Sequence, residues 1–126
     1  TKFTNKLRTA IKTIKGHQQL YQGLKRAAYT SHNSSTAALL FVNAGIDTER
    51  TLSTQGDSFW WKTSGFNKID KPYEHFHKII RGFDPSHNGF QENEFTLTID
   101  GNCGFGGDLN CAILNHTGHI IKILSA

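Results

Sequence analysis

The order of apolar patterns along the chain is the feature that most constrains its fold. Near the start, apolar residues recur at helical spacing in two series, which are Leu7, Ala10, Ile11 and Ile14, then Leu20, Leu24, Ala27 and Ala28. They predict one or two helices over residues 4–29, with Gly16 as the expected break. Strand-like patterns begin only after residue 36. Helices followed by strands predict an α+β domain, with the helices packed against one face of a mixed sheet.

Five later segments have the pattern of strands. Residues 37–42 are apolar throughout and bounded by turn signals, which predicts a buried strand. Residues 77–81 predict another, and in residues 95–99 apolar side chains alternate with threonines, as in a half-buried strand. Residues 109–114 and 119–124 complete the set, joined by a turn at residues 115–118. The last three strands are expected to form an antiparallel meander.

The connecting segments carry their own predictions. Residues 31–35 read as a polar loop, and Pro72 is expected to open a short helix over residues 73–76. The cluster Phe59, Trp60 and Trp61 predicts a piece of the core. Residues 101–107, GNCGFGG, predict a turn in which glycines allow a positive φ and close backbone approach.

Length and composition indicate one domain over residues 1–126, helical in residues 1–30 and sheet-rich in residues 37–126. A chain of 126 residues with 37% hydrophobic and 19% charged content fits a globular class better than disorder. No apolar run approaches the roughly 20 residues that span a membrane. The chain begins at Thr1 and contains no Met, so we expect it to be part of a longer protein. Cys103 and Cys111 are too few for a disulfide framework, which favours a cytoplasmic protein, although a disulfide in the hairpin is an alternative.

The first 26 residues are strongly basic. They contain seven Lys or Arg and no Asp or Glu, within a formal net charge of +4 for the chain. Such a face could bind nucleic acid or an acidic partner, or it could be a solvated helix surface. The solvated surface is favoured because aromatic residues are sparse there and no nucleic-acid module signature follows.

Three other patterns could carry chemistry, but each is incomplete. GNCGFGG lacks the Lys-Ser or Lys-Thr of a phosphate loop. Cys103 has His116 and His119 on a neighbouring predicted hairpin, yet no cysteine-protease signature surrounds it. His75 and His77 could share a strand face, but no further pattern supplies the third and fourth ligands of a metal site.

Four motifs taken in order suggest a family. They are LLFVNAGID, LSTQGDSFWWK, KIIRGFDPSHNGF and TLTIDGNCGFGGDLNCAIL. Together they resemble the C-terminal half of the calcineurin-like metallophosphoesterases, and most closely the bacterial serine/threonine protein phosphatases and diadenosine tetraphosphate hydrolases. The resemblance runs from about Leu39 to Leu124, and TIDGNCGFGGDL is its most specific part. It implies that the sheet is part of an αββα sandwich.

The resemblance also implies a site. The family uses two metal ions to polarise a phosphoryl group and activate water, and its C-terminal half supplies two histidines. Asn43 and Phe83 stand at the two matching positions. An amide oxygen could still ligate a metal, whereas Phe83 has no donor. Asn43 is either a remaining metal ligand or a turn residue that bonds its own backbone. Lys62 and Arg81 are the candidate substrate-binding residues, Lys62 because a basic residue after the family's Trp holds phosphate.

The resemblance therefore implies that the chain is the C-terminal portion of a metal-dependent phosphoesterase. Its metal site is expected to be degenerate, and the chain is expected to be inactive by itself. Two divalent metal ions (Mn, Fe or Zn) are expected only in the longer protein, and a phosphorylated substrate or ligand is the expected partner. A non-catalytic phosphatase-like binding protein is the alternative, and a basic nucleic-acid-binding module is less favoured. No membrane partner is expected, while an apolar sheet face could form a homodimer.

Overall fold

The chain begins with two helices that form an arm. The computed structural model describes residues 1–31 and 37–126. Helix α1 (Lys2–Thr13) is capped by the Thr1 side chain, which accepts a hydrogen bond from the Thr4 amide. Helix α2 (His17–Gly23) starts after Gly16, whose φ of +90° reverses the chain. The predicted break at Gly16 is confirmed, but the predicted extension of the helix to residue 29 is wrong.

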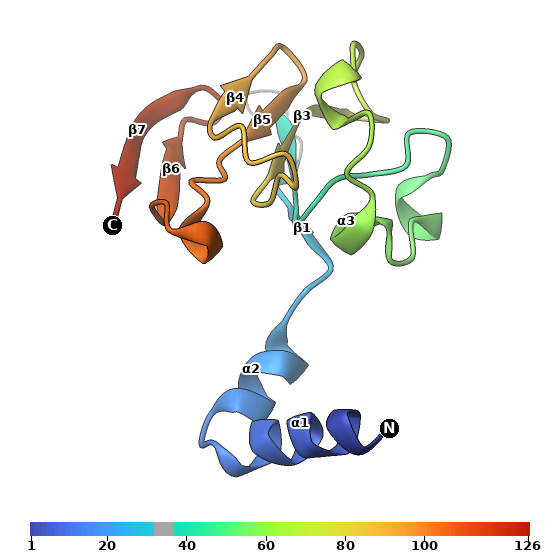
Figure 1. Cartoon of the computed structure of the whole chain (residues 1–126). Coiled ribbons are helices and arrows are strands. Elements are labelled where there is room, and N and C mark those ends of the chain that lie inside the picture. Colours follow the sequence, from blue (N-terminus) through green and yellow to red (C-terminus); the bar gives the residue numbers. More distant parts are fainter. Residues whose placement is uncertain (32–36) are drawn as a thin grey trace.

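This helical arm, residues 1–26, lies apart from the rest of the molecule. Figure 1 shows α1 and α2 beyond the sheet, connected to it by a short extended segment. Neither helix contains a buried residue. The expected packing of the helices on the sheet is therefore not what the structure shows. No described helix has both the length and the apolar content needed to cross a membrane.

A five-stranded mixed sheet forms the body, and the predicted α+β class is confirmed. The strand order is β1-β2-β3-β5-β4. Strands β2, β3 and β5 run parallel to one another, whereas β1 and β4 pair antiparallel at the two edges. The bounds are β1 (Ala27–Tyr29), β2 (Ala38–Val42), β3 (Phe76–Arg81), β4 (Gln91–Glu92) and β5 (Thr96–Thr98). The predicted strands at residues 37–42, 77–81 and 95–99 are all present.

The two faces of the sheet carry separate cores because side chains alternate along each strand. The larger core includes Leu40 and Ile79 on one face, packed with Phe59, Phe66 and Phe76. The smaller core is formed on the other face by three buried residues, Leu39, Ile80 and Leu97, with partly buried side chains packed against them. Apolar side chains on both faces explain why residues 37–42 read as one continuous apolar run.

The C-terminal strands form a separate hairpin. Strand β6 (Asn110–Leu114) pairs antiparallel with β7 (Ile120–Ser125), as predicted. The Asn115 side chain accepts hydrogen bonds from the Thr117 and His119 amides, which fixes the predicted turn. The three-strand meander is wrong, because β5 pairs with β3 and β4 instead of β6.

Two further expectations about the connections are corrected. No helix follows Pro72, since Tyr73 and Phe76 form an isolated antiparallel bridge. In helix α3 (Ser58–Trp61), Phe59 is buried as expected, but Trp61 is 77% exposed. The predicted polar loop at residues 31–35 lies outside the described residues, except for Ser31.

The glycine-rich turn owes its shape to close backbone approach, as predicted. A Cβ atom on Gly107 would overlap the Gly101 carbonyl oxygen, and one on Gly101 would overlap the Asp108 carbonyl oxygen. Asn102 and Gly106 both adopt positive φ angles, of 64° and 89°. By contrast, a Cβ on Gly104 would meet no other atom within 4 Å.

These glycines provide a matched pair of substitutions. We expect Gly107→Ala to lower the free energy of unfolding by about 1–3 kcal/mol, because the methyl group would force the backbone apart. Gly104→Ala should leave stability nearly unchanged, since its Cβ enters open space. Urea unfolding of both variants measures the difference. Equal stability of the two variants would contradict the close approach.

Candidate functional site

The carboxyl ends of the parallel strands meet at one edge of the sheet. The Asn43 carbonyl, just after β2, accepts hydrogen bonds from the amides of Gly82 (3.1 Å) and Phe83 (2.9 Å), just after β3. The Arg81 carbonyl in turn accepts from the Ile99 amide after β5 (3.0 Å). Positions 43 and 83, which the resemblance pairs as metal-ligand positions, therefore lie on adjacent strand ends.

Helix α3 is attached to the same edge. The Asn43 side-chain nitrogen donates to the Trp60 carbonyl at 3.2 Å, and the Ala44 amide donates to the Phe59 carbonyl at 2.8 Å. A Cβ on Gly45 would overlap the Lys62 carbonyl oxygen. Glycine at position 45 thus allows the chain after β2 to lie directly against the residue that follows the tryptophans. The Lys62 backbone therefore lies against Gly45, two residues after Asn43.

Arg81 is buried among protein groups. Its side chain is 2% exposed, its Nε donates to Thr98 Oγ1 at 2.8 Å, and one terminal nitrogen lies 3.2 Å from Asp84 Oδ1. The guanidinium carbon also lies 4.4 Å from the centre of the Phe66 ring. Burial lowers the pKa of Arg81, while the carboxylates of Asp84 and Asp100 act in the opposite direction. Arg81 thus connects β3, β5 and the turn at Phe66, and it does not face an open cavity.

Two carboxylates complete the edge behind Phe83. Asp84 is 2% exposed, and its Oδ2 atom has no hydrogen-bond partner among the described residues. Asp100 accepts from the Asp84 amide with one oxygen and from the Asn102 amide with the other, both at 2.8 Å. The Asp84 carboxylate therefore pairs with Arg81 through one oxygen and retains acceptor capacity on the other.

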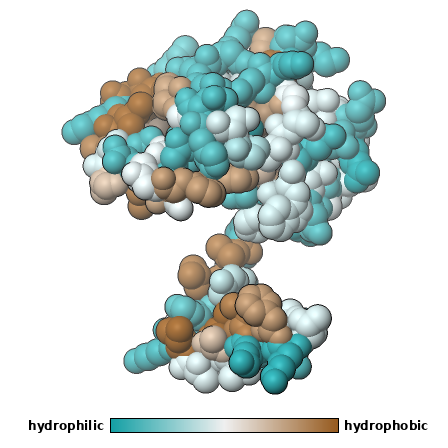
Figure 2. Space-filling view, in the orientation of Figure 1, coloured by the Kyte–Doolittle hydropathy of each residue, from teal (hydrophilic) through white to brown (hydrophobic). Residues whose placement is uncertain are grey.

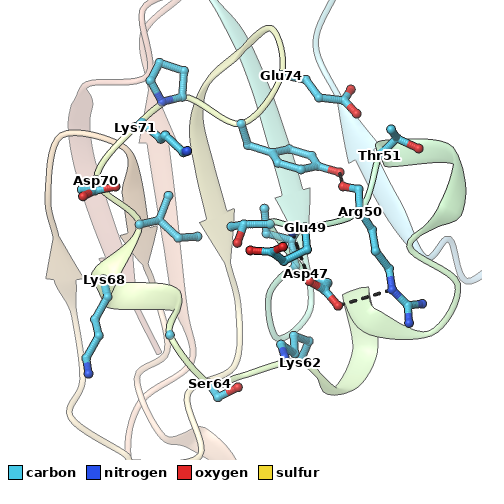
Figure 3. A pocket seen from close by; sticks show the side chains of 16 residues that line it. Asp47, Glu49, Arg50, Thr51, Lys62, Ser64, Lys68, Asp70, Lys71 and Glu74 are labelled. Atoms are coloured by element: carbon cyan, nitrogen blue, oxygen red, sulfur yellow. Dashed lines mark hydrogen bonds and ion pairs between the residues drawn. The ribbon is translucent and has the colours of Figure 1, made fainter.

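An open cavity of about 600 Å³ lies beside Lys62. Figure 3 shows side chains of both charge signs around it, with Ile46 and Ile69 among its apolar lining. Lys62 is exposed and lies at one end, next to Ser64. The charged lining residues are Asp47, Glu49, Arg50, Lys62, Lys68, Asp70, Lys71 and Glu74. Four of these residues are basic and four are acidic, so the lining has no net formal charge, and Lys62 is one of its exposed cations.

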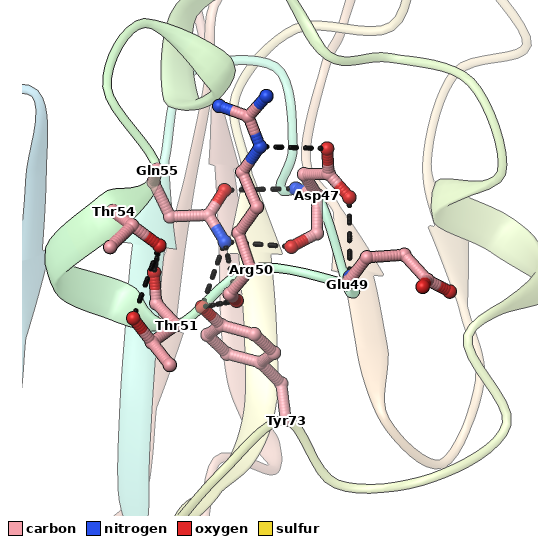
Figure 4. A network of polar contacts seen from close by, with 7 residues as sticks. All are labelled: Asp47, Glu49, Arg50, Thr51, Thr54, Gln55 and Tyr73. Carbon is pink, nitrogen blue, oxygen red and sulfur yellow. Dashed lines mark hydrogen bonds and ion pairs between the residues drawn. The ribbon is translucent and has the colours of Figure 1, made fainter.

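A polar network fixes the wall of this cavity (Figure 4). The buried Gln55 side chain accepts from the Asp47 amide at 2.9 Å and donates to the Asp47 carbonyl at 2.7 Å. The Tyr73 hydroxyl donates to the Arg50 carbonyl at 2.7 Å, and Arg50 pairs with the Asp47 carboxylate at 3.3 Å. This network could not be predicted from the sequence, because Tyr73 lies outside the four motifs and nothing in the motif that contains Gln55 marks it as a buried hydrogen-bonding residue.

The residues present do not fit a two-metal centre. Within residues 1–31 and 37–126, no group of three or more His, Cys, Asp or Glu side chains could hold a metal ion. Phe83 has no ligand atom, and Asn43 could supply only one, its amide oxygen, since its nitrogen donates to the Trp60 carbonyl. His75 and His77 are both exposed. Cys103 and Cys111 are free and exposed.

Comparison with known proteins yields no match. No family model, curated protein or solved structure matches this chain. A functional conclusion therefore rests on the motifs of the chain and on the geometry described above.

Tyr73 gives the cavity wall a measurable pH dependence. Burial raises the pKa of Tyr73 above its ordinary value of 10.0; the charges of Glu74 and Asp47 add to this, and the Gln55 hydrogen bond opposes it. The folded state thus favours the neutral phenol. Its contribution to stability is complete below pH 10.0 and is lost as the pH rises toward the folded pKa.

We expect Tyr73→Phe to reduce stability at neutral pH by about 1 kcal/mol, because the Arg50 carbonyl loses its donor. The variant should also lose less stability than the wild-type chain between neutral and strongly alkaline pH. Urea unfolding as a function of pH measures both effects. Tyr21→Phe, at an exposed position, is the control and should match the wild type. An alkaline loss in Tyr73→Phe equal to that of the wild type would refute this role.

Proposed function

We propose that the chain is the C-terminal portion of a calcineurin-like metallophosphoesterase with a degenerate metal site. In this proposal it binds a phosphorylated ligand at the carboxyl edge of β2 and β3 and does not hydrolyse phosphate esters by itself. Its two free, exposed cysteines favour a cytoplasmic protein. The proposed function is supported by the order of the four sequence motifs together with the geometry at the carboxyl ends of β2 and β3.

One observation carries the proposal. The hydrogen bond from the Phe83 amide to the Asn43 carbonyl, 2.9 Å long, joins the two positions at which the family has histidines. These positions are 40 residues apart in the sequence. Open sheets with parallel strands bind ligands beyond the carboxyl ends of those strands, which is where this pair lies.

Lys62 is the proposed phosphate contact. It follows α3, its backbone lies against Gly45, and its exposed side chain lines the cavity of about 600 Å³. An ammonium group attracts phosphate as a point charge, without the bidentate geometry of arginine. Arg81 is proposed to act indirectly, by holding Asp84 and the end of β3 in place.

The metal ions belong to the longer protein in this proposal. Two divalent ions, Mn, Fe or Zn, would need ligands from outside this chain, because an asparagine and a phenylalanine replace the two histidines. The alternative is that the whole protein is a non-catalytic phosphatase-like binder, because neither of the two matching positions holds a histidine. The nucleic-acid module is less favoured, and binding that weakens steeply with salt would identify it.

Phosphate binding tests the role of Lys62. We expect phenyl phosphate to perturb the NMR signals of residues around the cavity, and Lys62→Ala to weaken this binding by about fivefold or more through the loss of one charge. Lys122→Ala, which removes an exposed lysine from β7, should leave the affinity unchanged. No binding, or equal weakening by both substitutions, would rule out the proposed contact.

Restoring the histidines tests the resemblance itself. We expect the double variant Asn43→His/Phe83→His to bind Zn²⁺ or Mn²⁺ at least about tenfold more tightly than the wild-type chain, because two imidazoles would then meet on adjacent strand ends. Titration calorimetry measures the affinity, and circular dichroism checks that the fold is retained. Asn88→His, which adds an imidazole to an exposed loop, is the control. A folded double variant with no gain over this control would contradict the assignment of the two positions.

A further inference from the structure

The face of the sheet that carries the smaller core is incompletely covered. A groove of about 700 Å³ lies between β2 and β6. Leu39 and Phe41 line one wall, and Ala112 and Leu114 line the other. The hairpin is attached to the sheet through the Ala37 amide, which donates to the His116 carbonyl at 3.1 Å. Apolar side chains thus border a channel that no described element fills.

The helical arm presents a matching surface. On α1 and just after it, Phe3, Leu7 and Ile14 recur at helical spacing and are 75%, 49% and 51% exposed. The basic residues of α1 lie on the remaining sides of the helix. Figure 2 shows hydrophobic residues at the surface of the arm and on the side of the body formed by β6 and β7. An amphipathic helix that lays its apolar side into an apolar groove is a common mode of recognition.

The arm and the rest of the chain, taken as wholes, also carry opposite net charge. Residues 1–26 contain seven basic and no acidic side chains, whereas residues 27–126 contain seven basic and ten acidic ones. The arm is therefore +7 and the rest of the chain is −3, with His neutral. Long-range attraction favours the approach of an arm to the body.

The arm is directed away from the groove of its own chain. Arg26, at the end of the arm, donates to the Gly56 carbonyl at 3.5 Å, and Gly56 lies close in sequence to α3. Phe59 of α3 belongs to the larger core, whereas the groove lies on the face of the smaller core. The connection from α2 to β1 is only three residues long, Leu24, Lys25 and Arg26. This short connection favours contact with another molecule over folding back around the sheet edge.

We propose that the helical arm of one copy docks in the groove between β2 and β6 of a second copy, with the two copies exchanging arms. Such an exchange uses the same two surfaces on each copy, so it closes at a dimer. It buries the exposed apolar side chains of the arm and completes the smaller core. It is independent of the proposed phosphate site, which lies at the carboxyl ends of the strands.

Sedimentation of the full 126-residue chain across micromolar concentrations tests this proposal. We expect a dimer of twice the 14.1 kDa chain mass. The arm variant Leu7→Asp/Ile14→Asp and the groove variant Ala112→Glu should each be monomeric. Ile113→Glu is the matched control and should remain dimeric, because neighbouring side chains of a strand point to opposite faces. Circular dichroism checks the fold of every variant.

Mixing the two monomeric variants gives the sharper result. A mixed pair retains one intact arm and one intact groove, so it should associate, whereas neither variant associates with itself. A monomeric wild type, a dimer that survives both sets of substitutions, or a mixture that stays monomeric would each overturn the proposal. A monomeric wild type could instead bind anionic vesicles or DNA, with this binding lost in the arm variant but kept in Ala112→Glu. That result would assign the arm to the membrane or DNA partner and would also overturn the proposed dimer. Phenyl phosphate binding should be the same in all these variants.

Discussion

The buried guanidinium of Arg81 is the interaction on which the carboxyl edge of the sheet depends. It is contacted by Thr98 from β5, by Asp84 from the loop after β3, and by the ring of Phe66. Removing a cation from water is costly, and a buried pair is tolerated only when its geometry and its other hydrogen bonds are good. The pair fixes the loop that carries Phe83, and that loop in turn bonds to Asn43. The position of the candidate site therefore follows from one buried charge.

Much of the sheet could be predicted from the sequence, because local patterns determine it. The strand at residues 37–42 and the turn at residues 115–118 are marked by continuous apolar residues and by Asn and Gly at the required positions. Such local patterns could not show that the predicted three-strand meander is wrong. Which neighbour β5 pairs with depends on its parallel register with β3, a long-range choice that no local signal encodes. Trp61 was misplaced for a related reason, since aromatic clusters favour burial but a helix of one turn buries only one side.

The candidate site was predictable in part. The motifs singled out Asn43, Phe83 and Lys62, and the structure brings the first two together and places the Lys62 backbone against Gly45. The sequence left Asn43 as either a turn residue or a former ligand. In the structure, the Asn43 side chain connects β2 to α3 by donating a hydrogen bond to the Trp60 carbonyl. This structural role is compatible with both alternatives. Arg81 was a candidate substrate-binding residue from its place in the motif, and only the fold reveals that it is buried.

The short edge strands of the five-stranded sheet also affect how this chain could aggregate. Strand β1 has three residues and β4 has two, so neither edge offers a long row of free backbone groups to an added strand. The hairpin differs, because β7 is six residues long, carries Lys122 as its only charged side chain, and is exposed over most of its length. Templated strand addition, the first step toward fibrous aggregates, would therefore begin at the outer edge of β7.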